Sequence, residues 1–134
     1  MIYAVIDTNV LVSALLTSHA DSATVMVMNA VINGDITPMY NEEILKEYEE
    51  VLSRKKFRFS KSLIKQYLNF FSSVGIASER VRSTEDFPDP KDVVFYEVAL
   101  SQEDAFLVTG NTKHFPKTPI VVTPAEMLSI LAKV

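Results

Sequence analysis

The sequence predicts an α/β fold in which helices cover both faces of a central, mostly parallel sheet of four to five strands. Two observations favour this class. The stretches 2–6 and 105–108 are unbroken apolar runs, as expected of strands that are covered on both faces. Such runs alternate along the chain with helical patterns, which indicates parallel strands joined by helices. We find no internal repeat and no boundary, so we expect one domain over residues 1–134.

The composition narrows the class of protein. The chain of 134 residues can bury a substantial core, and it has no cysteine for a disulfide or a thiolate metal site, which is compatible with a reducing cytoplasm. No apolar run approaches the roughly 20 residues that span a bilayer, and no basic segment precedes the first run. We therefore expect a cytoplasmic protein without a membrane helix or signal peptide. The net charge of −4 argues against a surface that attracts nucleic acid as a whole.

In the first half of the chain, polar residues and breakers divide the expected elements. Asn41 is expected to cap a long helix, and Gly34 to follow the end of the helix before it. Pro38 interrupts a strand and favours a position where its missing N–H does no harm. The expected elements are a strand at 2–6, helices at 8–16 and 23–33, a strand at 36–40, and a helix from Asn41 to about Arg54.

The second half continues the alternation. Gly75 ends a helix, and Thr123 and Glu126 form a capping box with Pro124 at the first helical position. The expected elements are a helix at 60–74, a weak strand at 76–81, a polar stretch at 82–92, a helix body at 93–100, strands at 105–108 and 120–122, and a final helix opened by Thr123.

Polar side chains follow the two buried strands at the point where each strand ends. Asp7, Thr8 and Asn9 follow the first, and Thr109 and Asn111 follow the strand at 105–108. Ligands bind at this carboxyl edge in open parallel sheets, so we expect these side chains to meet there. For Asp7 and Asn9 an alternative stays open, because both residue types commonly cap the helix that follows them.

Two further acids are candidates for the same edge. Glu47 flanks the apolar stripe of its helix and lies beyond the first turn, so the helix dipole does not explain it; a solvated flank position is the alternative. Asp89 fits an N-cap and Pro90 the first helical position, which is a sufficient structural explanation for Asp89. Asp92 falls at the third position of this helix, where capping explains it only in part, and its side chain would point toward the sheet edge.

Asp7, Glu47 and Asp92 together would require a cation, because like charges at close range raise one another's pKa. Oxygen ligands without cysteine or histidine indicate Mg²⁺ or Mn²⁺. Mg²⁺ held by a few carboxylates takes phosphate oxygens as further ligands, so the expected substrate is a phosphate ester. His19 and His114 lie in expected loops, and we interpret both as surface or packing residues.

A basic segment follows the helix that carries Glu47. Its cations alternate with Phe57 and Phe59, a pattern that can clamp phosphates and stack a base. The alternative is a solvated helix end whose cations complement the dipole while both phenylalanines are buried. The candidate contacts to RNA are Arg54, Lys55, Lys56 and Arg58.

Four stretches, in order, resemble the motifs of PIN domains. Residues 5–15 (VIDTNVLVSAL) resemble the opening motif, and residues 44–52 (ILKEYEEVL) the second, whose acid falls at Glu47. Residues 88–92 (PDPKD), with Phe95 and Ala99, resemble the third motif with its acid at Asp92, and residues 107–115 (LVTGNTKHF) the fourth. The likeness covers essentially the whole chain. It is closest to the subgroup identified as toxin components of toxin–antitoxin pairs, related to the VapC ribonucleases.

The resemblance implies a three-layer α/β/α PIN-like fold and Mg²⁺- or Mn²⁺-dependent endonucleolytic cleavage of RNA. It also implies a homodimer and, for the toxin branch, a cognate antitoxin protein. The residues that it implies are the metal ligands Asp7, Glu47 and Asp92, the catalytic Asn111, and the supporting Thr8, Asn9 and Thr109.

The chain departs from the family pattern at Asn111, where many PIN nucleases carry aspartate. With one less negative charge, a second metal would bind more weakly, and a weakly active PIN module that binds RNA or a protein is therefore the alternative. A phosphoacceptor receiver domain shares the size and the alternation. The receiver fold requires a pair of acids after the first strand. Here a single acid, Asp7, is followed by Thr8, which argues against this alternative.

Overall fold

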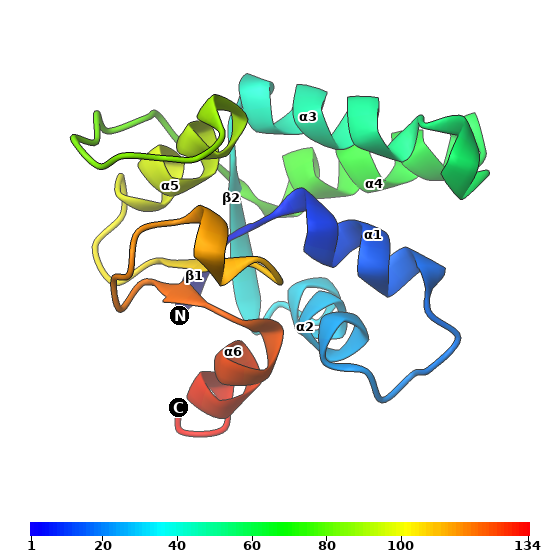
Figure 1. The fold of residues 1–134 in the computed structure, drawn as a ribbon. Helices are drawn as coiled ribbons and strands as arrows, with labels where there is room; N and C mark the ends of the chain where they lie inside the picture. The colour runs from blue at the N-terminus through cyan, green and yellow to red at the C-terminus, as the bar shows by residue number, and fades with distance from the viewer.

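The computed structural model describes residues 1–134 and contains one five-stranded sheet in which all strands are parallel (Figure 1). The strand order is β3-β2-β1-β4-β5. The strands are β1 (Ile2–Ile6), β2 (Ile36–Tyr40), β3 (Ile76–Ala77), β4 (Phe106–Val108) and β5 (Val121–Val122). The expected class, strand number and parallel arrangement are confirmed.

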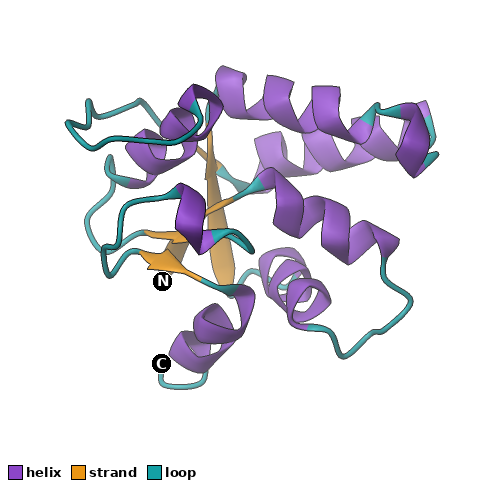
Figure 2. Cartoon of the chain, in the orientation of Figure 1, coloured by secondary structure: helices purple, strands orange, loops and turns teal.

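Six α-helices cover the sheet in two layers, with the strands between them (Figure 2). On one face α4 and α5 contact the strands and α3 contacts both of these helices, while on the other face α2 contacts β2, α1 and α6. The helices are α1 (Thr8–Leu16), α2 (Ala23–Ile32), α3 (Glu42–Leu52), α4 (Lys61–Val74), α5 (Val93–Ala99) and α6 (Pro124–Leu131). Short 3₁₀ helices are η1 (Lys55–Phe57), η2 (Pro90–Asp92) and η3 (Thr112–His114).

Side-chain caps explain where the helices begin. Asn41 accepts from the Ile44 amide at the start of α3, and Ser60 caps α4 in the same way. Thr123 and Glu126 form the expected reciprocal capping box at α6. Each cap satisfies amide groups that have no partner within the helix, so the polar residues before the apolar patterns fix these starts.

Backbone constraints at two glycines and a proline set the turns. Gly34 follows α2 with φ of 86°, a left-handed conformation that favours glycine. At Gly75 a Cβ would lie 2.6 Å from the carbonyl oxygens of Phe71 and Pro38, so only glycine fits between α4 and β2. Strand β3 pairs only with Met39 and Tyr40, which leaves Pro38 just outside the paired stretch on that side.

Three expected boundaries differ from the structure by more than one residue. The strand expected at 76–81 ends at Ala77, because the chain then turns to α5, where the Val81 amide donates to the Glu97 carbonyl. Helix α3 ends at Leu52 and η1 follows it. The helix expected from Pro90 begins as η2 and becomes α-helical at Val93.

One apolar core of 28 buried residues lies between the sheet and both helical layers. It includes most of β1 and the inner faces of α3, α4 and α5, where Tyr48 packs against Phe71 and Phe95 with ring centroids 5.2 Å and 6.3 Å away. No helix of the chain is both long and apolar enough to cross a membrane.

Candidate active site

The strand order creates a switch point at the carboxyl ends of β1 and β4. From β1 the chain builds β2 and β3 on one side of the sheet and then crosses to build β4 and β5 on the other. Loops leaving β1 and β4 therefore diverge, and ligands of open α/β sheets bind in the crevice that this divergence opens. Asp7 follows β1 and Thr109 follows β4, so the sequence places polar groups directly at this crevice.

Asp7 is buried, with 6% of its surface exposed, and its carboxylate does not cap α1 although its backbone occupies the N-cap position. Its Oδ2 instead accepts hydrogen bonds from the Thr109 hydroxyl at 2.7 Å and from the Asn9 amide at 3.1 Å. The Thr109 hydroxyl in turn accepts from the Asn111 amide, and the Asn9 Oδ1 accepts from Gly110. These bonds tie the two strand ends together and fix the Asp7 carboxylate.

The electrostatics of Asp7 are unfavourable for its charged form. Burial raises the pKa of its carboxyl group to about 6, the hydrogen bond from Thr109 opposes this, and the negative charge of Asp92 raises the pKa further. The Tyr48 hydroxyl donates a hydrogen bond to the Ile6 carbonyl. Burial, together with the negative charge of Asp7, raises the pKa of Tyr48 well above its usual value, so Tyr48 stays neutral. The charge on Asp7 thus has hydrogen-bond donors around it but no cationic side chain in contact.

Asp92 lies at the junction of η2 and α5. Its Oδ2 is buried and has no hydrogen-bond partner, and the nearest group of opposite charge is the His114 Nδ1 at 3.4 Å. Burial and the charge of Asp89 raise the pKa of the Asp92 carboxyl, while His114 opposes them. Asp89 itself accepts from the Lys91 amide and caps η2, as its position in the sequence predicts.

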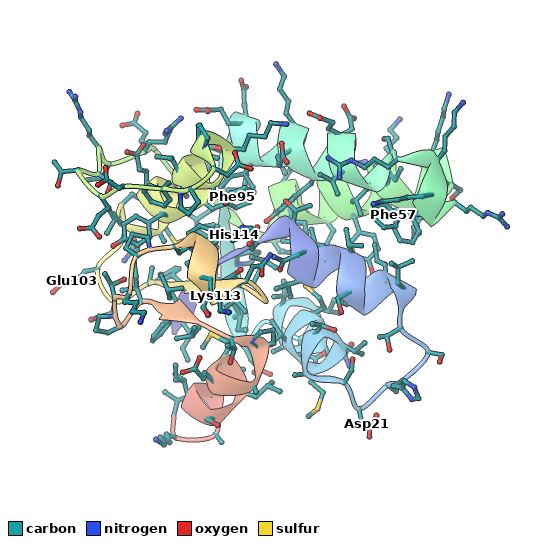
Figure 3. All side chains as sticks on the ribbon, in the orientation of Figure 1. Asp21, Phe57, Phe95, Glu103, Lys113 and His114 are labelled. Atoms are coloured by element: carbon teal, nitrogen blue, oxygen red, sulfur yellow. The ribbon has the colours of Figure 1, made fainter.

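A cleft of about 750 Å³ joins these groups, and all four of the expected catalytic side chains line it: Asp7, Glu47, Asp92 and Asn111. Glu47 reaches it from α3, where it is half-buried on the flank of the apolar stripe. In Figure 3 His114 lies where η3 approaches the start of α1, at the same end of the cleft as the acids. Four separate segments of the chain therefore converge on one crevice.

The donor set fits a divalent cation held by two carboxylates. No three acidic or histidine side chains lie close enough together to hold a metal ion by themselves. Asp7 and Asp92 nevertheless repel each other, which contributes to the raised Asp7 pKa, and the buried Asp92 Oδ2 makes no hydrogen bond, with the His114 Nδ1 3.4 Å away. Mg²⁺ is commonly bound through one or two carboxylates, with water and substrate phosphate completing its octahedron. Glu47 lies in the cleft but is not among the charges that shift the Asp7 pKa.

The supporting and basic residues are placed unevenly. Asn9 and Thr109 contact Asp7, whereas the Thr8 hydroxyl is buried without a hydrogen-bond partner. Of the four expected cations, Arg54 lines the cleft; the other three, Lys55, Lys56 and Arg58, are exposed beside it. The expectation that both neighbouring phenylalanines are fully buried is wrong, since Phe57 and Phe59 are each partly exposed and stack on one another.

Sequence reasoning missed two residues that line the cleft, His114 and Lys91, and one buried acid outside it, Glu97. His114, interpreted as a surface or packing residue, is exposed but faces Asp92, and Lys91 also lines the cleft. Glu97 is buried on α5 and holds Arg80 and the Ser83 amide. An acid within the apolar run 93–100 was the available signal for Glu97, and the position of His114 close behind Asn111 was the signal for the histidine.

Comparison of the sequence with known protein families identifies the family to which this fold belongs. The sequence model of the PIN domain matches residues 3–113, which is most of the chain. The chain belongs to the PIN domain family. No curated protein matches the sequence. PIN domains are generally nucleases that depend on divalent metals, and the cleft lies at the edge of the sheet where the family motifs of this chain converge.

Proposed function

We propose that this PIN domain is a Mg²⁺- or Mn²⁺-dependent endoribonuclease. The observation that carries the proposal is the pair of Asp7 and Asp92. Asp7 is buried and Asp92 is half-buried at the switch point of the sheet, their charges repel, and neither has a lysine or arginine partner. A divalent cation relieves that repulsion and attracts a phosphodiester to the same place.

The residues that line the cleft would have different roles in this reaction. Asp7 and Asp92 would hold the cation, with Asp7 kept in position by the Thr109 hydroxyl and the Asn9 amide. Glu47, which lines the same cleft from α3, would bind the cation or orient the attacking water, and Asn111 would hydrogen-bond a water or a phosphate oxygen. Thr8 would support the site from the first turn of α1, where its buried hydroxyl has no hydrogen-bond partner in the chain.

When bound there, the cation supplies polarisation of the phosphodiester and favours deprotonation of the attacking water. The protein supplies position. The hydrogen bonds from Thr109 and Asn9 prevent the Asp7 carboxylate from rotating away, and the buried Asp92 oxygen makes no hydrogen bond, with the His114 Nδ1 at 3.4 Å as its near neighbour. Lys91 and His114 border the acids and can contact the phosphate, which compensates for the negative charge of the cleft.

The biological setting belongs to the same proposal. The motifs around Asp7, Glu47, Asp92 and Asn111 resemble those of the toxin branch of PIN domains, so we propose that the chain is the toxin of a toxin–antitoxin pair. It would then act in the cytoplasm, form a homodimer and be held inactive by a cognate antitoxin. A short DNA-binding protein encoded immediately beside it would support this setting, and its absence would count against it.

A direct test uses a mixture of single-stranded and structured RNAs incubated with the protein, with and without chelator. We expect Mn²⁺-dependent internal cleavage that is lost in chelator and in Asp7→Asn. The variant Asp35→Asn, which removes an exposed carboxylate far from the cleft, serves as control. Cleavage by Asp7→Asn at the rate of the parent protein would exclude the proposed role of the cleft.

A second candidate function rests on Asn111. Because this position has an amide where many PIN nucleases have an acid, the chain could bind RNA or a protein with little or no cleavage. Calorimetry with Mn²⁺ separates the two candidates. Binding in the sub-millimolar range supports the nuclease, and no binding at millimolar metal favours the non-enzymatic module.

A further inference from the structure

The cleft has a second end that the proposed cleavage chemistry does not use. Its apolar lining comes from α1, α3 and η1: Val12, Leu16, Val51 and Phe57. Asp7 precedes α1 and Leu16 is its last residue, so this end lies roughly 13 Å from the acids along a helix of nine residues. Figure 3 shows Phe57 near the C-terminal ends of α1 and α3, well away from His114 at the acidic end.

Phe57 is a fixed aromatic surface. Its ring stacks on Phe59 with centroids 5.7 Å apart and an interplanar angle of 19°. The segment turns sharply after it, because Arg58 has φ of 58° and its amide donates to the Lys55 carbonyl. The Phe57 side chain is only partly buried and borders the cleft. A ring held in this way can stack on a planar ligand without first losing conformational freedom.

The cations next to this ring in the sequence form no ion pairs. Arg54 lines the cleft beside Phe57, and neither it nor any neighbouring cation forms an ion pair, since the ion pairs of the chain involve only Arg80 and His114. The Lys56 ammonium lies over the Phe57 ring at 5.1 Å from its centroid. Four cations thus fall within five residues of the segment that carries Phe57, in a chain of net charge −4: Arg54, Lys55, Lys56 and Arg58.

We propose that this end of the cleft is a subsite for one unpaired nucleobase of the substrate strand. The base would stack on Phe57 against the apolar wall of Val12, Leu16 and Val51, and the phosphate beside it would contact Arg54. A nucleotide joins an aromatic ring to an anion, which is the combination that this surface complements. The flexible Lys56 side chain would leave the ring and pair with the same phosphate.

This inference rests on the proposed function and adds a substrate requirement to it. The bound base belongs to a neighbouring nucleotide, because the Leu16 end of α1 lies roughly 13 Å along the helix from Asp7. A base inside a duplex already stacks on both faces and cannot reach Phe57. The protein should therefore prefer single-stranded substrates that have a base at one defined position beside the cleaved phosphate.

The subsite is tested by binding without cleavage. A short single-stranded RNA with 2-aminopurine at successive positions is titrated with the protein in chelator, and the fluorescence gives the Kd. We expect quenching at one position, with Phe57→Ala weakening binding roughly 10-fold to 100-fold and Phe57→Trp retaining it. Arg54→Gln should also weaken binding, while Lys65→Gln, an exposed cation on α4 outside this cleft, should not. Thermal unfolding checks that each variant is folded.

A second arm separates stacking from a purely structural role. RNAs with one abasic site at successive positions should bind the parent protein more weakly at one position only, and Phe57→Ala should not respond to that same site. Three results would each overturn the subsite: losses of affinity from the abasic site and from Phe57→Ala that add up, equal affinity for duplex RNA, or unchanged binding by Phe57→Ala. The apolar wall would then be assigned to contact with a protein segment. Because binding is measured without metal, a failure of cleavage would overturn the nuclease and not this result.

Discussion

Two buried carboxylates in this protein show opposite electrostatics. Asp7 and Glu97 each expose only 6% of their surface, but the pKa of Asp7 is raised to about 6 while that of Glu97 is lowered. Glu97 accepts from the Arg80 guanidinium at 2.8 Å and from the Ser83 amide at 2.7 Å. Asp7 accepts only from a hydroxyl and a side-chain amide.

The difference shows what each carboxylate contributes. Glu97 has its counter-charge within the chain, so its charge stabilises the fold by holding the segment after β3 against α5. Asp7 has no lysine or arginine beside it, and the attraction of His114 does not offset its burial, so its ionised form costs free energy until a cation arrives. Burial alone therefore does not separate a structural acid from a functional one; the charge of its partners does.

The largest expected effect is that of Asp7→Asn. Loss of the negative charge should lower Mn²⁺-dependent cleavage on the order of 10³-fold or more, because the cation loses a ligand. In chelator at pH 7 the same change should raise the free energy of unfolding by on the order of 3 kcal/mol, since a carboxyl with a pKa of about 6 in place of 3.8 no longer has to ionise. Urea unfolding and a cleavage assay measure the two effects.

Asp35→Asn is the matched control, because Asp35 is exposed and outside the cleft, and it should change neither quantity measurably. A less stable Asp7→Asn protein at pH 7 would contradict the comparison, since it would mean that the Asp7 charge stabilises the metal-free fold.

The pH dependence sharpens the comparison. Between pH 4 and 6 the folded state binds more protons at Asp7 than the unfolded state, so the Asp7 contribution to the free energy of unfolding falls as the pH rises through this range. For Glu97 the sign is reversed: its contribution is present above 4.5 and is lost as the pH falls through its lowered pKa. Urea unfolding in chelator from pH 4 to 7 measures the sum of the Asp7 and Glu97 contributions to the free energy of unfolding.

Subtracting the Asp7→Asn curve from that of the parent protein isolates Asp7. The parent protein should become less stable than Asp7→Asn by on the order of 3 kcal/mol as the pH rises from 4 to 7. Millimolar Mn²⁺ should reduce this deficit, because a bound cation stabilises the folded parent protein by mass action. A flat difference curve would show that Asp7 ionises without cost.

A smaller effect is expected at the other carboxylate. Glu97→Gln leaves the partly exposed Arg80 with only Glu43 as a partner and weakens the bond to the Ser83 amide, so we expect a loss of about 2 kcal/mol of stability. Glu43→Gln removes the exposed side of the same network and should cost less than about 1 kcal/mol. Cleavage at a temperature where both variants are folded should persist; its loss in Glu97→Gln would assign Glu97 to the site.

The same contrast explains what the sequence could predict. Asp7 was found because it ends an apolar strand, and the rule that parallel strands present their carboxyl ends at one edge brought Thr109 and Asn111 to it. Glu47 was found from helical periodicity. These are local patterns combined with one topological rule, and the all-parallel order of the strands bears them out.

What the sequence could not predict depends on contacts between segments without periodicity. The ion pairs of Arg80 with Glu43 and Glu97 join residues 37 and 17 positions apart, and no pattern specifies them. These contacts draw the chain off the sheet after Ala77, which is why the expected strand to 81 is shorter. His114 likewise faces Asp92 only because η3 turns back over the sheet edge.

The smallest effect expected within the cleft is at Asn111, at the rim of the acidic end. Asn111→Asp adds a negative charge beside Asp7 and Asp92, so Mn²⁺ affinity should rise roughly fivefold to tenfold, about 1 kcal/mol, because the charge at this exposed position is screened by water. Thr112→Asp places the same charge on an exposed neighbour outside this cleft and should leave the affinity within twofold. Calorimetry measures both. If the two variants bind Mn²⁺ equally well, the Asn111 side chain does not act on the metal, and the fourth motif contributes only through the Thr109 hydroxyl that holds Asp7.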